Sequence, residues 1–256
     1  DQTYHWGLLD REVYLAIWIT VFTLLGFYLL GKIRFAHDDK VEHISVKRLA
    51  LAIAVFSFVV YMIPGMFGAP LKALSGYLPP ITTQDFVMGQ NTAPAQNGSA
   101  PAGSDLGGKS AGYGLHLPLG LSGYFDLDEG LAAARKAGKP VFVDITGHGC
   151  VNCREMESRV WSDPRVLEIL QNDYIIVALY TDDKQKLDEK DWVTTANGDV
   201  LKDLGRVNSY IARTRFGVNA QPNYVLLSPE GEMLAPVRGY DLSIPGFIEF
   251  LKSGLE

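Results

Sequence analysis

Two long apolar runs limit what this chain can fold into more than any other feature of its sequence. Residues 13–31 and residues 49–71 contain 19 and 23 consecutive residues without a charged side chain. As an α-helix rising about 1.5 Å per residue, the first run is roughly 29 Å long, close to the hydrocarbon thickness of a bilayer. Both runs lack the polar stripe of a helix in a soluble bundle, so we expect two transmembrane helices within a membrane segment at residues 1–84. Pro64 and Gly65 predict a kink or an early end of the second helix.

Basic residues around the apolar runs predict their orientation. The loop between the runs carries five of them: Lys32, Arg34, Lys40, Lys47 and Arg48. Arg11 alone precedes the first run, and Lys72 alone closely follows the second. The positive-inside rule therefore places the loop in the cytoplasm and both ends outside, as in a multi-pass protein of a bacterial inner membrane with its C-terminal domain in the periplasm. Asp10, Arg11 and Glu12 stand where a signal peptide has a basic region, and no small-residue cleavage site follows the first run, which argues against a cleaved signal.

A stretch of small and polar residues separates the apolar part from the rest of the chain. Residues 90–114 are rich in Gly, Ala, Ser, Pro, Asn and Gln and contain almost no large apolar side chains. Such a segment cannot bury a core, so we expect a flexible linker at 85–117 and a folded domain at 118–256. The whole net charge of −6 lies from Pro118 onward. An acidic domain argues against nucleic-acid binding, which needs a basic surface.

From residue 118, apolar strands alternate with amphipathic helices. We expect strands at 140–146 and 174–180, a hairpin of 223–227 with 233–238, and helices at 126–137, 150–161, 163–170, 207–216 and 243–251. Residues 184–204 fit no single element and predict an inserted loop or hairpin around Asn197-Gly198. This order predicts an α/β domain, with a mixed sheet flanked by helices.

The two cysteines of the chain, Cys150 and Cys153, form a C-x-x-C between an expected strand and an expected helix. Two lone cysteines at this spacing indicate a redox site more than a disulfide framework. Free N–H groups and the dipole at a helix start favour the thiolate, so Cys150 is the expected nucleophile. Cys153, about one turn later, would resolve the mixed disulfide. Gly147 and Gly149 would let a partner chain approach closely.

Three other interpretations of the cysteine pair compete with this one. A haem-attachment motif needs His directly after the second cysteine, where this chain has Arg154. A structural zinc site needs four ligands, and the cysteines with His148 leave it short. A passive structural disulfide would close a very small loop with little entropic gain. The zinc site and the passive disulfide stay open as less favoured alternatives, and the sequence indicates no cofactor and no metal.

Two acidic residues near the cysteines are candidate catalytic groups. Asp144 lies in an apolar strand, where burial would raise the pKa of its carboxyl group, and it is placed to accept the proton of Cys153. The alternative is a carboxylate that reaches solvent at the strand end. Glu157 lies four residues after Cys153 on the same helical face, where it either tunes the dithiol or is an ordinary solvated side chain.

Two further features suggest contacts with a substrate. Gln221-Pro222 precedes a strand, and a cis peptide bond there would expose the Gln221 backbone to a substrate strand. Proline is also tolerated at a strand start for purely structural reasons. His148, if protonated, would help to stabilise the Cys150 thiolate; otherwise it shapes the loop.

The segments VFVDITGHGCVNCREME and QPNYVLL, with the upstream linker and apolar runs, resemble the DsbD family of membrane-bound thiol:disulfide interchange proteins. The resemblance covers nearly the whole chain: the last two membrane helices and the C-terminal periplasmic domain. It implies a thioredoxin fold and electron transfer from cytoplasmic thioredoxin to periplasmic disulfide proteins. It also implies that Cys150 is the nucleophile and Cys153 the resolving thiol. Asp144 and Glu157 match the two acids that tune the dithiol, and Pro222 matches the cis-proline.

The chain departs from this family at two points. Gly149 stands where thioredoxins usually carry Trp, which would alter partner contacts. Neither apolar run contains a cysteine, although the family relays electrons through a membrane cysteine pair. We therefore expect a C-terminal fragment that works with an upstream membrane domain of the same protein, or with a partner that carries such a pair.

The sequence thus favours a protein-disulfide reductase with periplasmic thiol–disulfide proteins as substrates and no nucleic-acid partner. One alternative is a disulfide-forming oxidase of the same fold, which differs in redox potential alone. Another is a redox-inactive, membrane-tethered binding module. The direction of electron flow does not follow from the residues.

Overall fold

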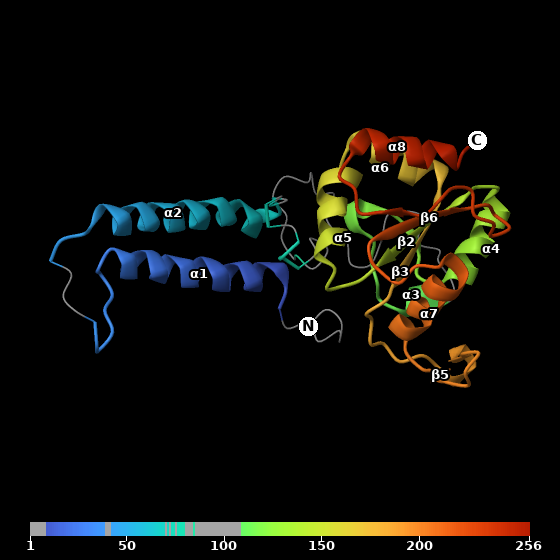
Figure 1. Cartoon of the computed structure of the whole chain (residues 1–256), viewed down its shortest axis with the longest axis horizontal. Coiled ribbons are helices and arrows are strands. Elements are labelled where there is room, and N and C mark those ends of the chain that lie inside the picture. Colours follow the sequence, from blue (N-terminus) through green and yellow to red (C-terminus); the bar gives the residue numbers. More distant parts are fainter. Residues whose placement is uncertain are drawn as a thin grey trace, which may run out of the picture. The chain divides into compact units, whose positions relative to one another are not determined.

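The computed structural model describes residues 9–38, 42–69, 71, 73–74, 76–79, 84 and 109–256. The chain divides into two compact units, one with the apolar helices and one with the C-terminal domain (Figure 1). The expected linker between 85 and 108 lies outside the described residues, as do Lys40 and Lys72.

The apolar unit is a pair of helices, α1 (Arg11–Leu29) and α2 (Val46–Met62), and a 3₁₀ turn, η2 (Ile63–Phe67), continues α2. By length and composition, Arg11–Leu29 and Val46–Phe67 are candidate membrane spans. The α-helix ends at Met62, just before Pro64, whose ring does not fit inside a regular helix. The early end is therefore confirmed, and the helical part of the second run stops at Phe67, short of the expected residue 71.

The two apolar helices pack closely against each other. Gly26 of α1 meets the ring of Phe56, and a Cβ at Gly26 would lie only 2.6 Å from that ring. Near the loop that joins the two helices, the Arg48 guanidinium donates to the carbonyl oxygens of Leu29 at 3.1 Å and Tyr28 at 3.2 Å. These bonds satisfy acceptors that the end of a helix leaves open. Large apolar side chains also face outward from the pair: Val13, Ile17, Val21, Leu51, Ile53 and Val60 are all exposed.

The C-terminal domain is built on a five-stranded sheet in the order β1-β3-β2-β6-β7. Its strands are β1 (Gly123–Tyr124), β2 (Val141–Thr146), β3 (Ile175–Tyr180), β6 (Asn223–Leu227) and β7 (Arg238–Gly239). β1 and β2 run parallel to β3, whereas β6 is antiparallel to β2 and β7. This is the expected mixed sheet. The last strand is shorter than expected, because residue 233 makes one isolated bridge to Leu227 and regular pairing begins at Arg238.

Two layers of helices cover the sheet (Figure 1). The helices are α4 (Leu127–Ala137), α5 (Val151–Met156) with its π-helical continuation η5 (Glu157–Trp161), α6 (Pro164–Asp173), α7 (Leu204–Phe216) and α8 (Ile244–Ser253). Val141, Val143 and Ile145 of β2 pack in the apolar cluster of α4 and α7. Phe142 packs in the other cluster, with α6, α8 and the end of the α5–η5 helix. Because side chains alternate along a strand, Asp144 points to the same face as Phe142.

Side chains at the helix starts explain most helix boundaries. Asp126, Asp163 and Ser243 each accept a backbone N–H from the first turn of the helix that follows. The helix expected at 207 begins earlier, at Leu204. Its start is fixed by Asp203, whose carboxylate accepts the N–H of Arg206 at 3.1 Å.

The domain begins before residue 118, so the expected linker boundary is wrong at this end. A short helix, α3 (Lys109–Gly112), is held by Glu129, whose carboxylate accepts the Ser110 N–H at 2.9 Å and its hydroxyl at 2.6 Å. Leu117 is 5% exposed and lies in the apolar cluster. The Ser and Gly content of this segment predicts a linker, because composition does not reveal that a carboxylate distant in the sequence binds the segment.

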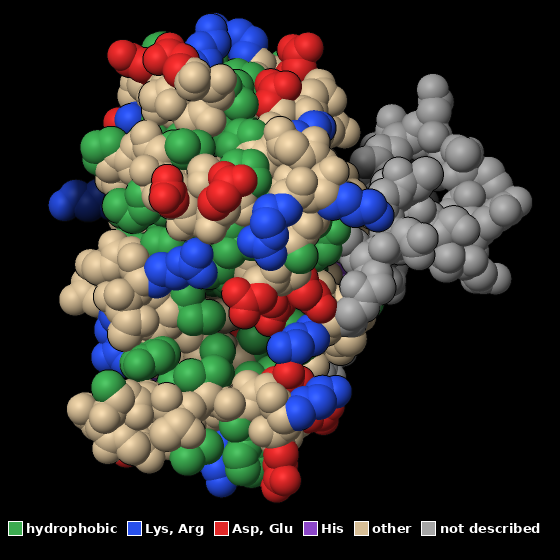
Figure 2. Space-filling model, turned by 90° about the vertical axis from the view of Figure 1, so that its right-hand side faces the viewer, with side chains coloured by type: hydrophobic (Ala, Val, Ile, Leu, Met, Phe, Trp, Pro, Cys, Tyr) green, Lys and Arg blue, Asp and Glu red, His purple; other side chains and the backbone are tan. Residues whose placement is uncertain are grey.

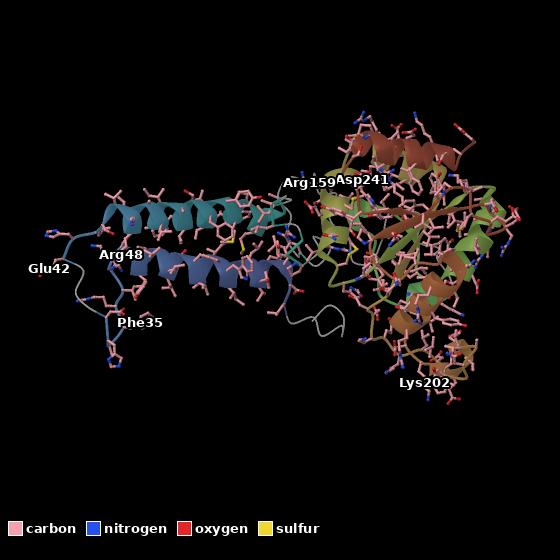
Figure 3. All side chains as sticks on the ribbon, in the orientation of Figure 1. Phe35, Glu42, Arg48, Arg159, Lys202 and Asp241 are labelled. Carbon is pink, nitrogen blue, oxygen red and sulfur yellow. A yellow bond between two sulfur atoms is a disulfide. The ribbon has the colours of Figure 1, made fainter. Side chains whose placement is uncertain are left out.

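The segment at 184–204 contains the hairpin that Asn197-Gly198 predicts. Its strands are β4 (Val193–Thr194) and β5 (Val200–Leu201), with Gly198 in a left-handed conformation at φ 87°. Lys202, labelled in Figure 3, lies 4.3 Å from the centre of the Trp192 ring. A Lys109–Asp191 ion pair of 2.8 Å joins this insertion to α3.

Charged side chains of both signs are interspersed on the face that Figure 2 shows. Basic groups alternate there with acidic groups and with hydrophobic ones, and no continuous basic area forms on this face.

The close contact of α4 with the sheet gives a test of the fold. A Cβ at Gly130 would lie 2.2 Å from Cγ2 of Val177, so Gly130→Ala should lower the free energy of unfolding by about 1–3 kcal/mol, although Ala favours a helix. Urea unfolding of the whole chain in detergent measures this. Gly112→Ala is the matched control, because nothing lies within 4 Å of its Cβ position. Equal midpoints for the two variants would contradict the packing described.

Candidate redox-active site

The two cysteines lie at the start of α5 and are joined as a disulfide, which Figure 3 shows in yellow. Cys150 is the N-cap residue of α5, and its Sγ accepts the backbone N–H of Cys153 at 3.1 Å. Cys150 is 6% exposed and Cys153 is 2% exposed, so Cys150 is the more accessible of the two, although the opening is small. After reduction the same N–H would stabilise a thiolate at Cys150.

Gly147 and Gly149 differ in what surrounds them. A Cβ at Gly147 would lie 2.6 Å from the amide end of the Gln221 side chain and 3.0 Å from Cγ of Asp182, so any other residue would have to displace these side chains. Gly149 is exposed, and the nearest atom to its Cβ position is an Asp182 oxygen at 3.6 Å. The backbone at Gly149 is therefore the open side of the loop, where a partner chain has room.

His148 turns its ring toward the domain. The ring stacks on Tyr180 with centroids 4.5 Å apart, and Nε2 lies 2.8 Å from Oδ2 of Asp183. The side chain is 8% exposed, and Asp183 is fully buried. This arrangement favours the interpretation in which His148 shapes the loop.

The loop before Cys150 is also bound through its backbone. The Asp182 carboxylate accepts the N–H of His148 at 2.8 Å with one oxygen and the N–H of Gly149 at 2.9 Å with the other. A charged acceptor makes such bonds stronger than neutral ones. The segment after β3 thus fixes the segment after β2.

A buried group of charges lies on the α5 side of the sheet. Asp144 is 3% exposed and Glu157 is 8% exposed, so the alternatives in which these carboxylates reach solvent are wrong. The Arg154 guanidinium is equally buried and lies 2.8 Å from Oε1 of Glu157. It also donates to Oγ1 of Thr146 at 3.3 Å. A positive charge therefore sits between the end of β2 and Glu157.

Burial shifts the proton affinity of both acids upward. Desolvation raises the pKa of Asp144 well above its usual range; Glu157 raises it further, and Arg154 opposes the shift. Desolvation also raises the pKa of Glu157, to about 7, against the opposing charge of Arg154. Among the described residues, Oδ1 of Asp144 has no hydrogen-bond partner. The Glu157 carboxyl group can therefore hold or release a proton near neutral pH, and the Asp144 carboxyl group binds its proton more tightly than an exposed one does.

The Gln221–Pro222 peptide bond is cis, as expected. Oε1 of Gln221 accepts a 2.6 Å hydrogen bond from the Thr181 hydroxyl, and the Gln221 side chain packs on Gly147. Pro222 is buried directly before β6. The cis-proline loop therefore lies beside the loop that leads to Cys150.

Sequence reasoning missed three residues of this site: Arg154, Asp182 and Asp183. In the sequence, Arg154 is the residue after Cys153 that excludes a haem-attachment motif. Its spacing of three from Glu157 also permits a helical ion pair, which the structure contains. Asp182 and Asp183 directly follow β3, the parallel neighbour of β2. Since parallel strands end at the same edge of a sheet, the two acids were predictable neighbours of the cysteine loop.

The described residues contain no group of three or more His, Cys, Asp and Glu side chains placed to hold a metal ion. Cys150 and Cys153 are bonded to each other, whereas a zinc ligand must be a free thiolate. Nothing in the described part of the chain supports the alternative of a structural zinc site.

Comparison with known proteins supports the fold. A family model described as thioredoxin-like matches residues 123–211. The thiol:disulfide interchange protein DsbD of Salmonella typhi is 37% identical over 77 residues, which are 30% of this chain and 13% of that protein. The chain therefore matches a small part of the length of this curated relative.

Several solved structures are similar over about half of the chain. The DsbH oxidoreductase is 17% identical with a TM-score of 0.40, and the match covers 55% of this chain and 90% of that one. A thioredoxin from Thermus thermophilus is 24% identical with a TM-score of 0.36, covering 50% and 82%. A disulphide isomerase from Xylella fastidiosa Temecula1 is 14% identical with a TM-score of 0.35, covering 51% and 88%.

The C-terminal part of this chain is a thioredoxin-like domain. The sheet order, the matched family model and the cysteine pair at the start of α5 agree on this. It has the fold of thiol–disulfide oxidoreductases, with a C-x-x-C pair at Cys150 and Cys153.

The shifted pKa of Glu157 makes stability depend on pH. Between its ordinary value of 4.5 and about 7, the folded chain binds this proton more tightly than the unfolded chain does. The free energy of unfolding therefore falls as pH rises through this window, by an amount on the order of 3 kcal/mol from this group. In the Glu157→Gln variant this fall in the free energy of unfolding should be absent, which urea unfolding at pH 4.5 and at about pH 7 measures.

Glu155→Gln is the control for this experiment, because the Glu155 carboxylate is half-exposed and its pKa lies below the ordinary value. In the Glu155→Gln variant the free energy of unfolding should still fall as pH rises through this window. If Glu157→Gln and the wild type lose stability in parallel, the carboxyl group of Glu157 does not titrate in this window.

Proposed function

We propose that this chain is part of a membrane-tethered protein-disulfide reductase that passes electrons from a membrane domain to periplasmic disulfide proteins. The observation that carries the proposal is the placement of Cys150. It caps α5, its Sγ accepts the N–H of Cys153, and it is the more exposed sulfur of the pair. The part of DsbD matched in sequence supports the same activity.

In the first step, the Cys150 thiolate attacks one sulfur of a substrate disulfide. A mixed disulfide forms, and the other substrate sulfur leaves as a thiolate that takes up a proton. The backbone N–H of Cys153, which already contacts Sγ of Cys150, stabilises the attacking thiolate. The exposed Gly149 and the cis Gln221–Pro222 bond would receive the substrate backbone next to the sulfur.

In the second step, Cys153 loses its proton and attacks Sγ of Cys150. The Cys150–Cys153 disulfide forms, and the substrate leaves with both sulfurs reduced, so two electrons have moved from this domain to the substrate. Asp144 is the proton acceptor that we assign to Cys153, since its carboxyl group is buried, has a raised pKa and keeps Oδ1 free of partners among the described residues. Glu157 and Arg154 set the charge around Asp144.

The membrane part of the proposal rests on the candidate spans and on basic residues. We propose that α1 and α2 cross a bacterial inner membrane, with the basic loop in the cytoplasm and the thioredoxin-like domain in the periplasm. The sequence has no cysteine in either helix. Reduction of the Cys150–Cys153 disulfide therefore needs a dithiol elsewhere, in an upstream membrane domain or in a partner.

Trapping tests the division of roles between the cysteines. Cys153→Ser removes the resolving thiol, so the full chain should accumulate mixed disulfides with periplasmic proteins, visible on non-reducing gels and lost on adding reductant. Cys150→Ser is the matched control and should trap several-fold less, because Cys153 is nearly inaccessible. Equal trapping by both variants, or none by either, would contradict the mechanism.

The reduction potential tests the direction of electron flow. A reductase should have a dithiol potential near that of thioredoxin, about −270 mV, whereas an oxidase lies near −120 mV. Equilibration of the full chain with glutathione buffers measures the value. A potential close to −120 mV would favour the oxidase, and the lack of any reversible dithiol would favour a redox-inactive binding module.

A further inference from the structure

Asp182 is the residue outside the proposed mechanism that is bound most directly to the cysteine loop. Its two carboxylate oxygens take the N–H groups of His148 and Gly149, the two residues before the nucleophile, at 2.8 and 2.9 Å. Its Cγ also lies 3.0 Å from the Cβ position of Gly147. The carboxylate is therefore held against the backbone of all three residues that precede Cys150.

The position of this carboxylate has an electrostatic consequence. N–H groups at the start of a helix are the main source of stabilisation for a thiolate there. At this site the neighbouring amides of His148 and Gly149 are already bound to a negative charge. A thiolate at Cys150 would be one residue away from that charge, and two negative charges at such a separation repel each other.

The other charged groups near the loop do not remove this effect. The His148 ring faces Asp183, not Asp182, and any positive charge on it is matched by that buried carboxylate. Arg154 is engaged with Glu157 on the α5 side of the sheet. Asp182 thus adds negative charge on the side from which the loop enters the helix.

We infer that Asp182 is a positioning residue that sets the redox potential of the Cys150–Cys153 pair toward reducing values. The inference rests on the proposed thiol–disulfide function and deepens it. The disulfide form carries no charge at Cys150, so Asp182 holds the loop in place at no electrostatic cost. The reduced form carries a thiolate that Asp182 disfavours, so electrons leave the dithiol more readily.

The test compares Asp182→Asn with the wild type in the full chain. Asn keeps one oxygen acceptor for the loop but removes the charge. The equilibrium constant with glutathione should shift roughly tenfold toward the dithiol, which corresponds to a potential about 30 mV less negative. The pKa of the Cys150 thiol, measured from the pH dependence of its alkylation rate, should fall in the same variant. A role limited to loop structure would move neither quantity.

Asp163→Asn is the matched control. Asp163 also accepts a backbone N–H, that of Arg165 at 3.0 Å, and Asn replaces Asp well at a helix start. It lies beyond the far end of the α5–η5 helix, roughly 17 Å along that helix from Cys150. This variant should keep the wild-type potential.

The outcomes separate the inference from the proposed function. An Asp182→Asn potential equal to that of the wild type, with an unchanged thiol pKa, overturns the inference and leaves the reductase proposal standing. A wild-type chain without a reversible dithiol overturns the proposed function itself. If Asp182→Asn unfolds, Asp182→Glu, which retains the charge, serves as the second variant. For a folded Asp182→Glu chain, the equilibrium constant with glutathione should stay within about threefold of the wild-type value, which corresponds to a potential shift of about 15 mV. A larger shift overturns the inference.

Discussion

The parallel pairing of β2 with β3 is the constraint on which the rest of the site depends. Thr146 and Tyr180 are in register at the ends of the two strands, and the Thr181 N–H donates to the Thr146 carbonyl at 2.9 Å. The segments that follow must therefore leave the sheet side by side. One carries Cys150 and the other carries Asp182, so the contact between them follows directly from the register. β6 pairs with the other edge of β2 and brings the cis-proline to the same place.

Beneath this edge the domain buries charges that a purely stabilising core would not contain. Replacing a buried ion pair with apolar groups is often neutral or stabilising, so the Arg154–Glu157 pair is weak evidence of a structural role. Asp144 lies between Val143 and Ile145 in a strand whose other side chains are apolar or hydroxyl-bearing. The apolar clusters on both sides of the sheet supply the stability that lets the domain keep these groups. Perturbed acids next to a dithiol are typical of functional sites.

Two segments at the edge of the domain differ in how well the local sequence predicts their structure. The hairpin in the 184–204 segment followed from Asn197-Gly198, because glycine readily takes the left-handed backbone that Gly198 adopts in the hairpin loop. The start of the domain at Lys109 did not follow. The Glu129 carboxylate, twenty residues later in the chain, binds the Lys109 N–H, and the composition of a short polar segment does not reveal such a distant bond.

The sequence by itself determined the elements and the chemistry of the site. Periodicity located the apolar helices and the strands β2, β3 and β6, and the C-x-x-C after a strand located the dithiol at a helix start, because these signals are local. Only the tertiary structure decided which charged side chains are buried and which of them contact the cysteine loop. Asp144 and Glu157 are buried together with Arg154, and Asp182 lies against the loop before Cys150. The helical spacing permits the Arg154–Glu157 pair, and the strand order makes Asp182 a neighbour of the cysteine loop. Burial of the charged group and the bonds from Asp182 to the loop depend in addition on how the sheet packs against its helices, which a local residue pattern does not encode.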